Sequence, residues 1–150
     1  MLVQAHTEGM VEIESCKTVL IVEDEEVLLE LLVHRFEKAG FKTISATNGP
    51  TACHLIGQKK PDVILLDILL PQLTGLVVLE MLRKHPTTNI ASTPVIVVTA
   101  QVSQSIIRRS LQLGANAFHF KPYSIIELIN TSHDLGNRHR ETLTRISHQK

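Results

Sequence analysis

One stretch of the sequence constrains the fold more than any other: residues 61–75, PDVILLDILLPQLTG. Its apolar residues run from Val63 to Leu66 without alternating with polar ones, which is typical of a strand covered on both faces of a parallel sheet. The run ends in a single carboxylate, Asp67, and the proline and glycine that follow mark a turn. In open α/β sheets, ligands bind at the carboxyl ends of the strands. The stretch therefore predicts a buried strand that presents Asp67 at a ligand-binding edge.

Taken alone, Asp67 is also compatible with an exposed turn aspartate, which is common in loops. The rest of the chain favours the strand end, because apolar runs and helical patterns alternate along it. Five short strands are predicted, at residues 18–22, 42–46, 63–66, 94–98 and 117–120. Helices are predicted at residues 25–39, 50–58, 73–84 and 103–113, with a polar loop at 85–93 and a last helix from Tyr123. This alternation predicts an α/β fold, a doubly wound parallel sheet of five strands with five helices.

The two ends of the chain lack the pattern of the middle. Residues 1–16 show no sustained period and are expected to form a flexible N-terminal arm. Gly136 and Asn137 are expected to end the last helix. The sequence thus predicts one ordered domain over residues 17–135, followed by a basic, polar C-terminal tail over residues 136–150.

Composition limits the classes of protein that fit. The chain has 150 residues, 43% of them hydrophobic, which suits one core and leaves no room for a second domain. Lysine and arginine number 15, as do aspartate and glutamate, so the positive field of a nucleic-acid binder is absent and no direct nucleic-acid partner is expected. No run spans a membrane and no signal peptide precedes the domain, so a soluble, cytoplasmic protein is expected. The scattered histidines and the two distant cysteines predict neither a transition-metal site nor a disulfide.

Polar residues follow four of the five predicted strands at the point where each strand ends. Glu23 and Asp24 follow the first strand, Asp67 the third, Thr99 the fourth and Lys121 the fifth. The carboxyl ends of parallel strands meet at the same edge of a sheet, so these side chains are expected to lie together.

The chemistry of this group points to phosphoryl transfer. Three carboxylates brought together repel one another and need a hard divalent cation, and ligation by oxygen atoms alone suits Mg²⁺. Lys121 supplies a positive charge opposite them, and Thr99 supplies a hydroxyl donor. Such a site is complementary to a phosphoryl group carried by a carboxylate, and Asp67 lies centrally enough to be the nucleophile that forms an aspartyl phosphate.

Four motifs stand in order along the chain: VLIVEDE, DVILLDILLPQLTG, PVIVVTA and FHFKPY. Together they resemble the receiver domain of two-component response regulators, over roughly residues 17–130. Each motif is weak alone, and the four in this order and spacing are specific. The resemblance implies a flavodoxin-like fold with strand order 2-1-3-4-5 and a site at the switch point between the first and third strands.

The resemblance also implies roles for individual residues. Asp67 matches the phosphoacceptor. Four positions match the ligands of Mg²⁺, namely the carboxylates of Glu23, Asp24 and Asp67 and the backbone carbonyl of Leu69. Thr99 and Lys121 match the residues that bind the phosphoryl oxygens, and Thr99 and Phe118 match the switch residues. Glu23 stands where aspartate is commoner, and Leu69 and Gln101 border the path of the attacking water, which leaves the lifetime of the phosphoryl group open.

The function that the resemblance implies is a phosphorylation-switched signalling module. It would take a phosphoryl group from a histidine kinase or a histidine phosphotransfer protein of a phosphorelay, and catalyse nothing beyond its own phosphorylation and dephosphorylation. Output would leave through the face of helix 103–113, strand 117–120 and the start of the last helix, around Ile106, Ile107, His119 and Tyr123. With no output domain in the sequence, a stand-alone single-domain regulator that contacts a downstream protein is expected.

Two other functions and one other role for a residue remain open. A receiver-like docking module that works without phosphorylation would be favoured by a missing acceptor or lysine, and neither Asp67 nor Lys121 is missing. A hydrolase of the haloacid dehalogenase type needs a second aspartate two residues after the nucleophile, where this sequence has Leu69. Phe118 can also be a core aromatic with no switching role.

Overall fold

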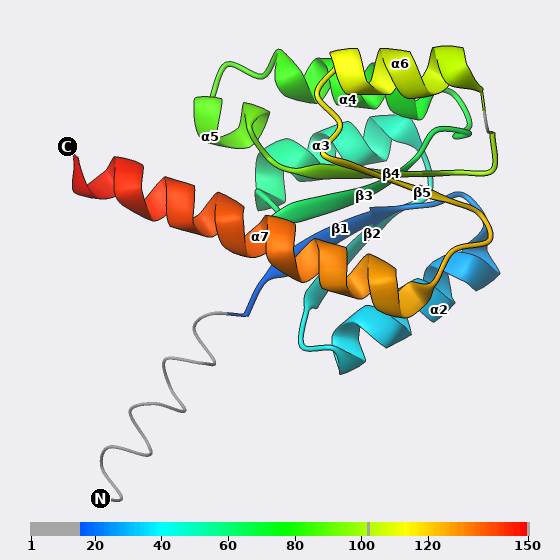
Figure 1. Cartoon of the computed structure of the whole chain (residues 1–150), viewed down its shortest axis with the longest axis horizontal. Helices are drawn as coiled ribbons and strands as arrows, with labels where there is room; N and C mark the ends of the chain where they lie inside the picture. Colours follow the sequence, from blue (N-terminus) through cyan, green and yellow to red (C-terminus); the bar gives the residue numbers. More distant parts are fainter. Residues whose placement is uncertain (1–15, 102, 150) are drawn as a thin grey trace, which may run out of the picture.

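The computed structural model describes residues 16–101 and 103–149. Within them, five parallel strands form one sheet in the order β2-β1-β3-β4-β5, as the sequence predicted (Figure 1). The strands are β1 (Thr18–Val22), β2 (Lys42–Ala46), β3 (Val63–Asp67), β4 (Val95–Thr99) and β5 (Ala117–Phe120). The chain therefore has the α/β, doubly wound, flavodoxin-like fold.

Helices cover both faces of the sheet. They are α2 (Glu26–Lys38), α3 (Gly49–Lys59), α4 (Gly75–Arg83), α5 (Thr88–Ala91), α6 (Gln104–Gln112) and α7 (Ile125–His148). α2 and α7 pack on one face, and α3, α4 and α6 pack on the other (Figure 1). The central strands β1, β3 and β4 are therefore closed to water on both faces, whereas the edge strands β2 and β5 are partly exposed.

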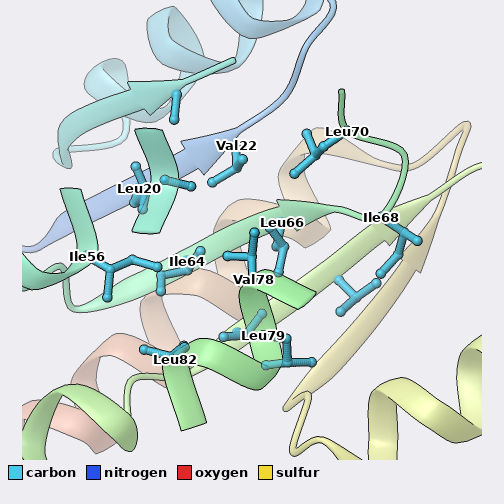
Figure 2. Close-up of a cluster of buried hydrophobic side chains, with 14 of the residues drawn as sticks. Leu20, Val22, Ile56, Ile64, Leu66, Ile68, Leu70, Val78, Leu79 and Leu82 are labelled. Atoms are coloured by element: carbon cyan, nitrogen blue, oxygen red, sulfur yellow. The ribbon is translucent and has the colours of Figure 1, made fainter. Parts of the chain in front are cut away.

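Alternate residues of each central strand enter opposite halves of the core. Leu20 of β1 and Leu66 of β3 pack beneath α3 and α4, together with Val78 and Leu79 (Figure 2). Their neighbours in sequence point the other way, where Phe36 of α2 packs with its own cluster. All five residues of β3 and all five of β4 are buried, which explains their unbroken apolar runs. Burying each large side chain stabilises the fold by about 1.5–3 kcal/mol.

The connection between β3 and α4 is fixed by one glycine. A Cβ on Gly75 would lie 2.8 Å from the Cα of Ile68 and closer still to the carbonyl oxygen of Asp67. The Gly75 amide donates to the Ile68 carbonyl at 2.9 Å, and the Thr74 hydroxyl caps α4 by accepting from the amide of Val77. The loop therefore folds back tightly against the end of β3.

Two predictions about helices were wrong. Residues 85–93 are not wholly a loop, because Thr88–Ala91 form α5 and its Ile90 is buried in the core, so the described residues form six helices rather than five. The last helix does not end at Gly136 and Asn137, since α7 continues to His148. Gly136 is buried there, and a Cβ would lie 3.0 Å from Cδ of Lys17, so this glycine allows close packing instead of ending the helix.

The structure does not reach every predicted segment. The predicted N-terminal arm lies outside the described residues, apart from Cys16. Among the helices that the structure describes, none combines the length and the apolar character needed to span a bilayer.

Candidate functional site

The register of the sheet brings the predicted site residues to one level. Val22 pairs with Leu66, and Thr99 pairs with Phe120. The residues that follow Val22, Leu66 and Phe120 are Glu23, Asp67 and Lys121, so these three and Thr99 share the carboxyl edge of the sheet. The predicted convergence of polar side chains at this edge is therefore confirmed by their positions.

Lys121 joins two of the carboxylates. Its Nζ donates to Oε1 of Glu23 at 2.6 Å and to Oδ2 of Asp67 at 2.8 Å. The other oxygen of Asp67, Oδ1, accepts from the backbone amide of Leu69 at 3.0 Å. Both carboxyl groups are almost wholly buried, so these charge-assisted bonds hold them with little competition from water.

Asp24 completes an acidic cluster at the same edge. One carboxylate oxygen from each of Glu23, Asp24 and Asp67 lies within 4.8 Å of the others, with Asp24 exposed and the other two buried. Oε2 of Glu23 is buried and has no hydrogen-bond partner among the described residues. A hard cation at this point would offset the repulsion and give that oxygen a partner, so the donor set fits Mg²⁺.

The burial of this cluster changes its acid–base properties. Burial raises the pKa of Glu23 to about 7, Lys121 acts in the opposite direction, and the neighbouring Asp67 adds to the rise. Burial lowers the pKa of Lys121, but the carboxylates of Asp67 and Glu23 outweigh it and leave that pKa above its usual value. Lys121 is therefore a permanent cation, while Glu23 can be neutral near pH 7 when no metal ion is bound.

Of the two predicted switch residues, Thr99 ends β4 at the same edge of the sheet and Phe118 lies on the neighbouring strand β5. Thr99 is fully buried, and its Oγ1 accepts from the amide of Gln101 at 3.1 Å, which leaves the hydroxyl proton free to be donated elsewhere. Phe118 is partly buried, packs against the core beneath α3 and α4, and stacks on Phe120 with 6.3 Å between ring centroids. Leu69 is exposed, and its predicted role as a carbonyl ligand stays a prediction.

Sequence reasoning missed one polar group next to the site. The hydroxyl of Tyr123 is buried without a hydrogen-bond partner in the described part of the chain, and burial raises the pKa of Tyr123 to about 12. Tyr123, Glu23 and Asp67 line the same small cavity of about 10 Å³. The sequence predicts Tyr123, two residues after Lys121, as a helix start and as part of the output surface, and gives its hydroxyl no role at the site.

The site combines the three groups that a carboxylate needs in order to accept a phosphoryl group. Asp67 is fixed through both oxygens, a lysine cation lies against it, and a buried hydroxyl lies at the end of the next strand. Such a site can stabilise negative charge that develops next to Asp67.

Comparison with known proteins gives a consistent result. The model of the response regulator receiver domain family matches residues 19–133. The regulatory protein AtoC of Escherichia coli is 38% identical over 110 residues, which are 73% of this chain and 23% of AtoC. RegX3 of Mycobacterium bovis is 41% identical over 75% of this chain and 47% of its own length. The polar-differentiation response regulator DivK of Brucella anthropi is 37% identical over 77% of this chain and 92% of its own length.

The chain thus spans less than half the length of the first two of these relatives.

Solved structures agree with the fold. The receiver domain of the Francisella response regulator 1452 superposes with a TM-score of 0.74 at 32% identity, over 81% of this chain and 98% of that one. The receiver domain of the sensor histidine kinase PA1611 of Pseudomonas aeruginosa, with a magnesium ion coordinated in its active site cleft, superposes with a TM-score of 0.70 at 25% identity, over 82% and 99%.

Proposed function

Since the chain belongs to the family of response regulator receiver domains, we propose that it is a phosphoacceptor module of two-component signalling and that Asp67 receives the phosphoryl group. One observation carries the proposal: the Lys121 ammonium bonds to both Asp67 and Glu23 inside a cluster of three carboxylates. A merely structural ion pair needs one carboxylate for one lysine. The two further carboxylates are explained if the site also binds a cation, which would offset their charge and attract an anionic substrate.

The cation that the donor set fits is Mg²⁺, which the carboxylates of Glu23, Asp24 and Asp67 would hold, and the backbone carbonyl of Leu69 is proposed as a further ligand. When bound, it neutralises charge on the phosphoryl oxygens and on the acids around them. The magnesium ion in the receiver domain of PA1611 supports this choice. The orphaned Oε2 of Glu23 is the feature of this chain that such an ion would satisfy.

In the proposed reaction an oxygen of Asp67 attacks the phosphorus of the donor. The bond from that oxygen to phosphorus forms while the bond from phosphorus to the donor breaks, and its electron pair leaves with the donor. Lys121 moves from the carboxylate to a phosphoryl oxygen, and the Thr99 hydroxyl donates to another. The protein catalyses only its own phosphorylation and the later hydrolysis.

The donor in the cell is proposed to be a histidine kinase or a histidine phosphotransfer protein, and the output is proposed to be binding of a downstream protein. Thr99 and Phe118 would connect the two. The face around α6, β5 and the start of α7 is the proposed output surface, because Phe118 and Ile106 pack against the same half of the core.

The experiment is phosphorylation by a small phosphodonor, followed by intact mass. Wild type with Mg²⁺ should gain one phosphoryl group, and Asp67→Asn should gain none. Asp134→Asn, which removes an exposed carboxylate from α7, should behave as wild type. Removal of Mg²⁺ with EDTA should lower the rate at least about tenfold.

Equal labelling of wild type and Asp67→Asn would overturn the assignment of the acceptor. No labelling of wild type by either a small donor or a phosphotransfer protein would favour a docking module that works without phosphorylation.

A further inference from the structure

The second half of α7 lies at the edge of the sheet opposite Asp67 (Figure 1). The family match ends at residue 133, whereas α7 continues to His148. Beside this continuation lies a pocket of about 290 Å³, bounded by α7 and by the residues that lead into β4 and β5. A five-residue strand is about 17 Å long, so the pocket is separate from the candidate phosphorylation site.

A buried histidine without a partner lines the pocket. His139 is only 9% exposed, and its ring bonds to no other residue in the described part of the chain. Burial lowers the pKa of His139, Asp62 acts in the opposite direction and Arg83 adds to the fall, so the ring is neutral near pH 7 and can donate from one nitrogen. Neither ring nitrogen is among the fully buried atoms that lack a partner, so the ring can be reached by solvent or by a ligand that accepts its hydrogen bond.

The side-chain amide of Asn116 has its oxygen already hydrogen-bonded and its nitrogen free to donate. Its Oδ1 accepts from the amide of Val95 at 2.9 Å and from Nη2 of Arg83 at 3.0 Å. These bonds occupy the oxygen, and within the described residues the Asn116 Nδ2 has no acceptor. Arg83 donates its other bonds to the carbonyls of Ala91, Thr93 and Gly114. These partners are neutral, so the positive charge of Arg83 adds to the potential at Asn116.

Arg138 gives the lining of the pocket a positive charge. The exposed guanidinium of Arg138 borders the pocket, and no carboxylate is among the described residues that line it. Leu135 and Pro94 supply an apolar wall. The pocket therefore offers donors from Asn116, His139 and Arg138, and the described residues that line it include no carboxylate that would repel an anion.

We propose that this pocket binds a small anion with a carboxylate or phosphate group. The Arg138 guanidinium, the Asn116 amide and the His139 ring hold the anionic group, and a short apolar part of the ligand packs on Leu135 and Pro94. The volume of the pocket is near the lower end of the range for small-molecule sites, so the ligand must be small. The site does not depend on phosphorylation of Asp67.

The test is an NMR titration of the full chain with inorganic phosphate and, separately, with acetate, both without Mg²⁺. The expected result is saturable shifts of the Asn116 side-chain amide and the His139 ring, with a Kd of about 1–10 mM for at least one probe. Acetate alone, phosphate alone or both would each support the site and would identify the anionic group.

Matched variants separate this site from general attraction of anions. Arg138→Gln and His139→Gln should each weaken binding about tenfold, whereas Arg145→Gln, which removes an exposed charge from the same helix, should not. Should His139→Gln fail to fold, Arg138→Gln decides alone because its side chain is exposed. The proposal is overturned if neither probe shifts these signals, if Arg138→Gln binds like Arg145→Gln, or if the shifts gather at Lys121 instead.

Discussion

At the scale of single residues, Glu23 is the most constrained side chain of the site. It is 3% exposed, bonds to Lys121 through one oxygen and leaves the other oxygen without a partner in the described residues. A proton or a metal ion can satisfy that oxygen. The two are alternatives, so the stability of the metal-free protein should depend on pH through this residue.

The expected pH dependence follows from the raised pKa. The pKa of Glu23 is about 7 in the folded protein and 4.5 as an ordinary glutamate. Between these values the folded state keeps a proton that the unfolded chain has lost, so the free energy of unfolding falls as the pH rises through this window. The loss is complete above the folded pKa. One pKa unit corresponds to about 1.4 kcal/mol, so a fall of about 1–3 kcal/mol is expected.

Glu23→Gln cannot titrate and is the variant that isolates this effect. Urea unfolding in EDTA at about pH 5 and about pH 8 should show Glu23→Gln gaining stability relative to wild type at the higher pH. Other groups titrate alike in both proteins and cancel in the difference. A difference that stays constant with pH would mean that Glu23 is ionised throughout.

At the scale of elements, the connection from β3 to α4 determines where Asp67 lies. Gly75→Ala would force a Cβ against the backbone of Asp67 and Ile68, which cannot move without displacing the acceptor. We expect a loss of about 1–3 kcal/mol in stability and slower phosphorylation of Asp67. Urea unfolding and intact mass measure the two effects.

Gly57→Ala is the matched control. Gly57 lies inside α3, and the nearest atom to its added Cβ is Nε2 of His85 at 3.8 Å, an ordinary contact. This change should be neutral or add about 0.5–1 kcal/mol through helix propensity, with phosphorylation unchanged. Normal phosphorylation of Gly75→Ala would show that the loop can relax without moving Asp67.

The second half of α7 is anchored by an ion pair at the other edge of the sheet. Nε and Nη2 of Arg140 donate to the two carboxylate oxygens of Asp62 at 2.9 and 3.1 Å, and Nη2 also donates to the carbonyl of Cys16 at 2.8 Å. Asp62 in turn accepts from the amide of Thr18 at 2.7 Å. The helix thus connects the starts of β1 and β3.

Arg140→Gln should therefore lower the free energy of unfolding by about 1–3 kcal/mol, because a partly buried carboxylate loses its cationic partner and keeps only the amide of Thr18. Phosphorylation of the folded variant should be unchanged, since Asp67 is at the opposite edge. Arg145→Gln on the same helix should change stability by less than about 0.5 kcal/mol. If the two variants were equally stable, the ion pair would contribute nothing measurable.

At the scale of the whole molecule, the sequence predicted what depends on local pattern. The strands and the five polar residues at one edge follow from apolar runs and from the rule that parallel strands share a ligand-binding edge, whereas the strand order was implied by the resemblance to receiver domains. Gly136 was misinterpreted because a glycine that ends a helix and one that allows close packing look the same in sequence. The pocket at His139 could not be predicted, because its residues come from α7 and two distant connections.

The switch belongs to this scale because it couples two strands and a helix. Val97 and Phe118 are paired in register and enter the same half of the core, so Thr99, two residues after Val97, lies on that same face. Ile106 of α6 packs there as well. His119 points to the other face, where its Nε2 lies 3.4 Å from Oγ1 of Thr131. On phosphorylation, the face of the sheet that packs on Ile106 should therefore change more than the face that carries His119.

We expect beryllofluoride with Mg²⁺, acting as a phosphoryl mimic, to draw the Thr99 hydroxyl toward Asp67 and to let Phe118 move into the space released, because packed cores change between discrete arrangements. NMR shifts and amide exchange should then change over residues 103–123. Thr99→Val, which keeps the shape and removes the hydroxyl, should retain changes near Asp67 and lose those at 103–123. Thr93→Val, an equally buried threonine at the opposite end of β4, should switch like wild type. Changes confined to the loops after β1, β3 and β5, with residues 103–123 silent, would mean that Phe118 is only a core residue and that output leaves by another face.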